Sequence, residues 1–144
     1  MKCNWKTSSL VAASLVLCSF QQRNATYLSF EKFITEENKM NFSTDSSYYI
    51  VVEPKMCTSC NVQALRVLSA YAGNKPLYIF CDSSKQQGLS VYVKHRKVKY
   101  ITRFDYKWVS KQIFMRSGVA FALGHSNKLQ YVAVINGTNL KQYE

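Results

Sequence analysis

The chain has little glycine, proline or cysteine, and each shortage excludes a class of protein. Its 144 residues include five Gly and two Pro and are 47% hydrophobic, which excludes a disordered, collagen-like or low-complexity chain. Five Cys are too few for a disulfide scaffold, and their odd number leaves at least one outside any intramolecular bridge. No internal repeat is present. The length therefore predicts one compact domain, with a basic balance of 19 Lys and Arg against eight Asp and Glu.

The first 18 residues have the pattern of an export signal. Lys2 and Lys6 provide a positive start, and an uncharged, largely apolar run covers residues 8–20. This run is shorter than the roughly 20 residues that a membrane-spanning helix needs. Residues 1–18 are therefore predicted to be a signal peptide, with a buried N-terminal helix or strand as the alternative.

Cys18, at the end of this run, resembles the lipid-attachment cysteine of bacterial lipoproteins. Leu15 matches the aliphatic residue that is usual three positions earlier, whereas Leu17 departs from the small residue usual directly before the cysteine. The resemblance implies export to a bacterial cell envelope and an acyl anchor on Cys18. A plainly secreted or periplasmic form is the alternative. Export also places the other cysteines where disulfides form and persist.

Residues 19–45 are a polar, weakly patterned segment. Phe30, Phe33 and Ile34 fall at helical spacing, which predicts one short helix there, with Ser29 as its cap.

From residue 46 onward the pattern indicates an α/β domain. Continuous apolar runs at 48–52 and 76–81 predict two buried strands. Apolar side chains at helical spacing in 61–72 predict the helix that joins them. Two buried strands connected by a helix form a βαβ unit with parallel strands.

The remaining elements complete an α/β sandwich with a mixed central sheet and helices on both faces. They are a turn and cap at 82–84, a helix at 85–95, a strand at 97–102, a helix at 106–115, strands at 119–123 and 129–135 joined by a hairpin turn at 124–128, and a short C-terminal helix.

The most specific signal is Cys57-Thr58-Ser59-Cys60, placed after a buried strand and at the start of a helix. A thiolate is the nucleophile of disulfide exchange, and the free amides and dipole of a helix start stabilise it. Cys57 is therefore predicted to attack a disulfide and Cys60 to resolve the mixed disulfide. Two alternatives are open: a structural disulfide, and a thiol site for Cu(I) or Zn.

At this point the chain resembles the thioredoxin superfamily, most of all the exported bacterial thiol-disulfide oxidoreductases. The resemblance covers about residues 48–135 and rests on the apolar strand before the cysteines, the helix and strand after them, and the final hairpin. It implies a thioredoxin-like sandwich over 46–144 that exchanges with protein thiols or disulfides and uses no bound cofactor. The implied site residues are Cys57 and Cys60 with their neighbours Met56, Thr58, Ser59 and Val119.

Three positions depart from the family pattern. Met56 stands where a Trp is common, Val119 falls where the family has its cis-proline, and Val51 replaces a buried acid. Without that acid, water or Glu53 would have to deprotonate Cys60. These departures favour the alternative of a non-catalytic thioredoxin-like module whose disulfide is structural.

Residues 85–116 carry nine Lys and Arg against Asp105 alone, a net charge of +8, with aromatic residues between them. Basic and aromatic residues together suit RNA, but export argues against nucleic acid as a partner. The segment is predicted to form a basic face, solvated or resting on anionic lipid head groups, with its aromatics in a helix-layer core. Cys81 is predicted to be a buried, inert hydrophobe, and His95 and His125 to be solvated.

Overall fold

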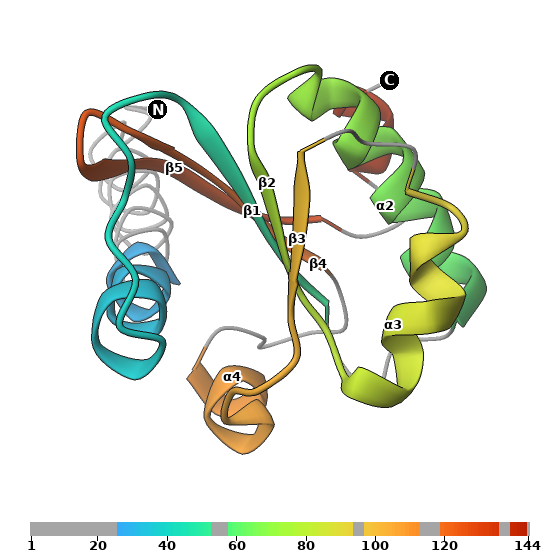
Figure 1. The fold of residues 1–144 in the computed structure, drawn as a ribbon, viewed down its shortest axis with the longest axis horizontal. Coiled ribbons are helices and arrows are strands. Elements are labelled where there is room, and N and C mark those ends of the chain that lie inside the picture. The colour runs from blue at the N-terminus through green and yellow to red at the C-terminus, as the bar shows by residue number, and fades with distance from the viewer. Residues whose placement is uncertain (1–25, 53–57, 94–96, 113–118, 136–138, 144) are drawn as a thin grey trace, which may run out of the picture.

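The computed structural model of the protein describes residues 26–52, 58–93, 97–112, 119–135 and 139–143. A five-stranded mixed sheet in the order β3-β2-β1-β4-β5 forms its centre (Figure 1). The predicted α/β class and mixed sheet are thereby confirmed. The strands are β1 (Ser47–Val52), β2 (Leu77–Phe80), β3 (Val98–Ile101), β4 (Val119–His125) and β5 (Lys128–Ile135).

Strand β1 is the middle of the sheet. It pairs in parallel with β2, which pairs in parallel with β3, and on its other side it pairs antiparallel with β4. The predicted βαβ unit is confirmed. All six residues of β1 are buried, because both faces of the sheet are covered, and this double burial explains the continuous apolar run in the sequence.

Helices cover both faces of the sheet. On one face lie α2 (Thr58–Ala72), α3 (Ser83–Ser90) and the 3-10 turn η2 (Leu140–Tyr143) (Figure 1). On the other lie a helix over 26–32, which continues as the π turn η1 (Phe33–Glu37), and α4 (Tyr106–Gln112). Successive side chains of a strand point to opposite faces, so β1 contributes to two separate apolar clusters.

The N-terminal helix is longer than predicted. Ser29 lies inside it and not at its start, so the predicted cap is wrong. Phe30, Phe33 and Ile34 are almost completely buried against the sheet, as their spacing suggested. The Tyr27 hydroxyl also donates a hydrogen bond to the Leu129 carbonyl of β5. This segment therefore forms part of a layer of the fold, in spite of its polar composition.

Helix α3 begins at Ser83, two residues before the predicted start at residue 85, and it also ends early. The Asp82 carboxylate accepts a hydrogen bond from the Ser84 amide at 2.8 Å, which confirms the predicted cap. The helix ends at Ser90, well before residue 95, because the chain turns there and buries Val93 beside Leu89 in the α2-side cluster.

The final hairpin has a tighter turn than predicted. Ser126 and Asn127 alone form it, and both have positive φ angles, of 53° and 60°. Their amides donate to the carbonyls of Thr44 and Ser43, which holds the turn in this conformation. Strand β4 therefore extends to His125, so the predicted turn at 124–128 is wrong, although His125 is exposed as expected.

Candidate functional site

The carboxyl ends of β1, β2 and β3 meet at one edge of the sheet, and the predicted redox chemistry belongs to this edge. Strand β1 ends at Val52, and Thr58, Ser59 and Cys60 form the first described turn of α2. The predicted helix over 61–72 is confirmed, and the observed helix also includes Thr58, Ser59 and Cys60, which the prediction left outside it. Met56, Cys57 and Cys18 lie outside the described residues.

The start of α2 is a favourable place for a thiolate. The first amides of a helix have no partner within the helix, and their dipoles favour a negative charge. Helix α2 is 15 residues long, which is long enough for its aligned peptide dipoles to favour a negative charge at the helix start. Residues 54–81 contain no Asp or Glu, so no carboxylate from this stretch opposes it.

Val119 stands at the same end of the sheet. It is the Cα partner of Val52 across the β1–β4 ladder, and its side chain is fully buried. That it faces the thiols stays a prediction. His125 lies at the opposite end of β4, where its Nδ1 is 3.2 Å from the Ser46 hydroxyl. His95 lies outside the described residues.

In the described parts of the chain, no buried Asp or Glu accompanies β1. Val51 is fully buried in the apolar cluster of the N-terminal helix and α4, as the sequence predicted. Among the residues that the structure describes, the buried polar side chains are Ser47, Asn61 and Ser69, none of which titrates. Asn61 follows Cys60 directly and was missed from the sequence, although it shares a helical face with Leu65 and therefore occupies a core position.

Cys81 follows β2 and is a buried free thiol, as predicted. Its amide donates to the Ile101 carbonyl at 3.2 Å, which ties it to the end of β3. Burial raises the pKa of this thiol to about 11, the Asp82 charge adds to the rise, and Lys85 opposes it. Cys81 therefore stays protonated at neutral pH and is a poor nucleophile.

Two tyrosines near Cys81 have unusual surroundings. The hydroxyls of Tyr100 and Tyr106 are buried, and neither has a hydrogen-bond partner. Burial raises the pKa of both groups, and the nearby Cys81 charge raises it further. The sequence indicated only aromatic residues of the basic run, because a missing hydrogen bond depends on tertiary packing.

Most cations of the basic segment that the structure describes are exposed. Its exposed cations are Lys97, Lys99, Arg103, Lys107 and Lys111. Phe104 and Trp108 instead pack around Phe33, so the prediction that the aromatics form a helix-layer core is confirmed for these two. Tyr92 is the exception, since it is 39% exposed. Contact of this face with lipid stays a prediction.

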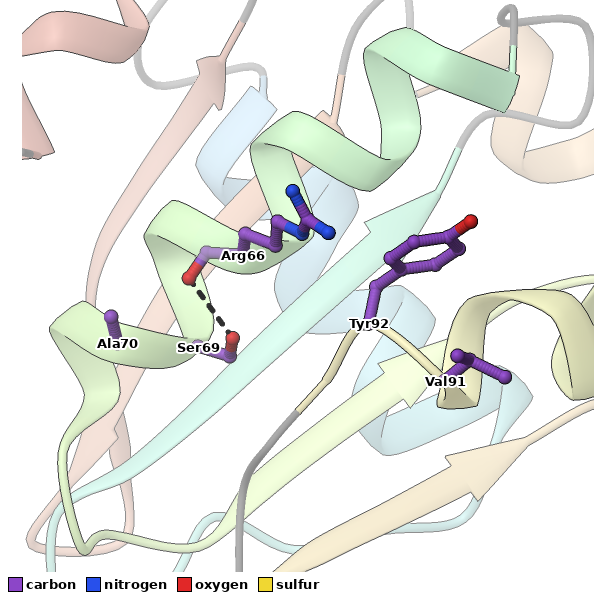
Figure 2. Close-up of a pocket in the computed structure, with 5 residues that line it drawn as sticks. All are labelled: Arg66, Ser69, Ala70, Val91 and Tyr92. Carbon is purple, nitrogen blue, oxygen red and sulfur yellow. Dashed lines mark hydrogen bonds between the residues drawn. The ribbon is translucent and has the colours of Figure 1, made fainter.

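Two adjoining hollows lie along α2, and sequence reasoning missed them. One, of about 300 Å³, is lined by Arg66, Ser69, Ala70, Val91 and Tyr92 (Figure 2). The other, of about 600 Å³, is lined by Ser59, Val62, Gln63, Arg66 and Tyr92. We call the two together the α2 groove. Arg66 and Tyr92 line both hollows and therefore lie where the two adjoin. The Arg66 guanidinium carbon lies 5.0 Å from the centroid of the Tyr92 ring.

Comparisons of the chain with family models, curated proteins and solved structures found no match. Within the described ranges, no group of three or more His, Cys, Asp or Glu side chains is placed to hold a metal ion. No helix in those ranges combines the length and apolar character needed to span a membrane. Function must therefore be inferred from the residues and their geometry.

Proposed function

We propose that this protein is a thioredoxin-like thiol-disulfide oxidoreductase that exchanges disulfides with protein partners through Cys57 and Cys60. The observation that carries this proposal is the position of Thr58, Ser59 and Cys60 in the first described turn of α2, which follows the central strand β1. A helix start at the carboxyl edge of a buried strand lowers the pKa of a thiol placed there.

The strand arrangement supports the thioredoxin-like part of the proposal. β1 pairs in parallel with β2 on one side and antiparallel with β4 on the other, and β4 continues as a hairpin into β5. The strands that carry the family resemblance thus lie in one sheet around β1. Strand β3 extends this sheet beyond β2.

The exchange needs only the two thiols and the partner. The Cys57 thiolate attacks one sulfur of the partner disulfide, forming a mixed disulfide while the partner's second sulfur leaves and takes a proton from water. Cys60, deprotonated by water, then attacks the Cys57 sulfur. This step forms the Cys57–Cys60 disulfide and releases the partner as a dithiol. The partner gains two electrons and the pair loses them, and the reverse sequence oxidises a partner dithiol.

The surroundings of Cys81 support the assignment of disulfide exchange to Cys57 and Cys60. Its burial and raised pKa keep it out of exchange, so the chemistry falls to the pair at the helix start. The thiol instead fills space between β2 and the helices α2 and α3.

The proposal places the reaction in a bacterial cell envelope. It rests there on the signal pattern of residues 1–18, on Cys18 as a lipid anchor, and on the exposed cations of 85–116, which suit anionic head groups. Metabolic labelling with an azide-bearing fatty acid in a bacterial host tests the anchor. Wild-type protein should incorporate label, and Cys18→Ser should not.

Trapping tests the chemistry. Cys57→Ser should abolish exchange, and Cys60→Ser should accumulate a mixed disulfide that non-reducing electrophoresis resolves. The reduction potential of the pair should lie in the catalytic range of roughly −120 to −270 mV. Absence of a trapped species under oxidising challenge would remove the main support for the mechanism.

A structural disulfide is the second candidate, and the apolar burial of Val51 favours it, because no acid there assists Cys60. It predicts a potential below about −300 mV and a Cys57→Ser variant with lowered stability. Unchanged stability of Cys57→Ser together with lost exchange would contradict it.

A further inference from the structure

The α2 groove reaches the first described turn of α2. Ser59, one of its lining residues, stands between Cys57 and Cys60 in the sequence. From there the groove follows α2 to Ala70, bounded on the other side by Val91 and Tyr92 (Figure 2). A polypeptide held at the cysteine pair would therefore have this groove as a path along the protein.

Both walls of the groove lack acidic residues. Residues 54–81 and 83–104 contain no Asp or Glu, and these two stretches supply every described lining residue. Arg66 is exposed and is the charged member of the lining within the described ranges. Neither wall contains a carboxylate to neutralise it, so a carboxylate from another molecule is the complementary ligand.

Contact with Tyr92 positions the Arg66 guanidinium to bind such a carboxylate. The Arg66 guanidinium carbon lies over the Tyr92 ring, 5.0 Å from its centroid, and a guanidinium held by this cation–π contact can offer N–H groups to a bidentate carboxylate. Figure 2 shows Arg66 extending from α2 toward the Tyr92 ring. Val91, 71% exposed, adds apolar surface beside this cation.

We propose that the α2 groove binds an acidic, extended segment of the disulfide-bearing partner, with one carboxylate on Arg66. This inference rests on the proposed exchange at Cys57 and Cys60. From Ser59 to Arg66 the helix rises about 10 Å, at 1.5 Å per residue. An extended chain covers that distance in about three residues, so a partner whose cysteine lies beside the first described turn of α2 should carry the carboxylate about three residues from that cysteine.

Matched disulfide peptides test the groove. Three peptides would be identical except for Glu, Gln or Lys three residues from the cysteine, and the rate constant of exchange with the reduced full chain would be measured. The wild type should exchange with the Glu peptide about threefold to tenfold faster than with the Lys peptide. The preference should shrink with added salt.

Variants assign that preference to the groove. Arg66→Gln should abolish it, and Arg66→Lys should keep only part of it, because an ammonium lacks the bidentate fork. Lys128→Gln is the matched control, since Lys128 is an exposed cation at the hairpin end of the sheet. All variants should exchange with neutral hydroxyethyl disulfide at the wild-type rate.

The outcomes separate the two proposals. Equal rates for the three peptides, or a preference that survives in Arg66→Gln, would overturn the groove. Failure to exchange even with hydroxyethyl disulfide would instead overturn the redox function. In that case, binding of a fluorescent Glu peptide with Ser in place of its cysteine decides the groove: binding that Arg66→Gln loses supports it, and no binding overturns it.

Discussion

Val52 and Val119 are direct Cα partners at the end of the β1–β4 ladder, and both side chains are buried. This pairing brings the start of the final hairpin to the point where the chain leaves β1 for the cysteine pair. Together with Cys81 at the end of β2, these two valines make the interior of this edge apolar. The proposed partner contact instead uses the exposed Arg66 of the α2 groove.

Gly124→Ala should destabilise the protein. A Cβ at Gly124 would lie 2.8 Å from the Phe42 ring and 3.0 Å from the Tyr49 ring, which pack edge to face. We expect the free energy of unfolding to fall by about 1–3 kcal/mol in urea titrations. Gly88→Ala is the control, because nothing lies within 4 Å of its Cβ, and alanine should stabilise α3 by about 0.5–1 kcal/mol. Equal stability of both variants would contradict this packing.

Phe33→Ala should cost about 3–5 kcal/mol of unfolding free energy, as large-to-small changes at buried aromatics do. The Phe33 ring contacts those of Phe80 and Trp108 and joins the N-terminal helix to the sheet and to α4. Leu28→Ala, at a side chain that is 56% exposed, should change stability by less than about 0.5 kcal/mol. Thermal unfolding of the full chain measures both. A Phe33 variant as mild as the Leu28 variant would place this helix outside the cooperative core.

Stability should fall in alkali because of Cys81. Its folded pKa of about 11 lies above the ordinary value of 9.0, so the neutral thiol is favoured in the folded state. The resulting stabilisation is complete below about pH 9 and is lost as the pH rises through about 11. We expect the stability difference between wild type and Cys81→Ala to shrink by about 2 kcal/mol over this range. Urea midpoints that keep a constant difference at every pH would contradict the shift.

Tyr106→Phe should be neutral or stabilising by up to about 1 kcal/mol, because the lost hydroxyl is buried without a hydrogen-bond partner. Tyr49→Phe provides the contrast. Its hydroxyl accepts a hydrogen bond from the buried Ser47 side chain at 3.0 Å, so its loss should cost about 1 kcal/mol. Denaturant titrations of the two variants compare them directly. A clear loss of stability in Tyr106→Phe would reveal a partner for that hydroxyl.

The parts of the fold that follow local pattern could be predicted from the sequence. Strand β1 is apolar along its whole length because both its faces are covered, and α2 repeats its apolar residues with the helical period. The predicted hairpin turn was misplaced because it included Gly124, and glycine is common in turns. The turn residues Ser126 and Asn127 adopt positive φ angles that are held by contacts with the distant Ser43.

One part of the candidate site could likewise be predicted from the sequence, and another part could not. A helix start after a buried strand is a local pattern, so the placement of Cys60 in the first turn of α2 could be predicted. The α2 groove could not, because Arg66 lies in α2 and Tyr92 in the turn after α3, and the two meet only in the folded chain. Asn61 was visible on the buried face of the helix and was overlooked.

The central position of β1 has a consequence during synthesis. Its antiparallel neighbour β4 is made only after β2, α3, β3 and α4, so one edge of β1 has no strand to pair with for much of translation. Residues Ser47–Val52 are uncharged and rich in aromatic and β-branched side chains, the composition that promotes pairing between chains. Nascent chains that stop before residue 119 should therefore aggregate, and arrival of the last hairpin ends that exposure.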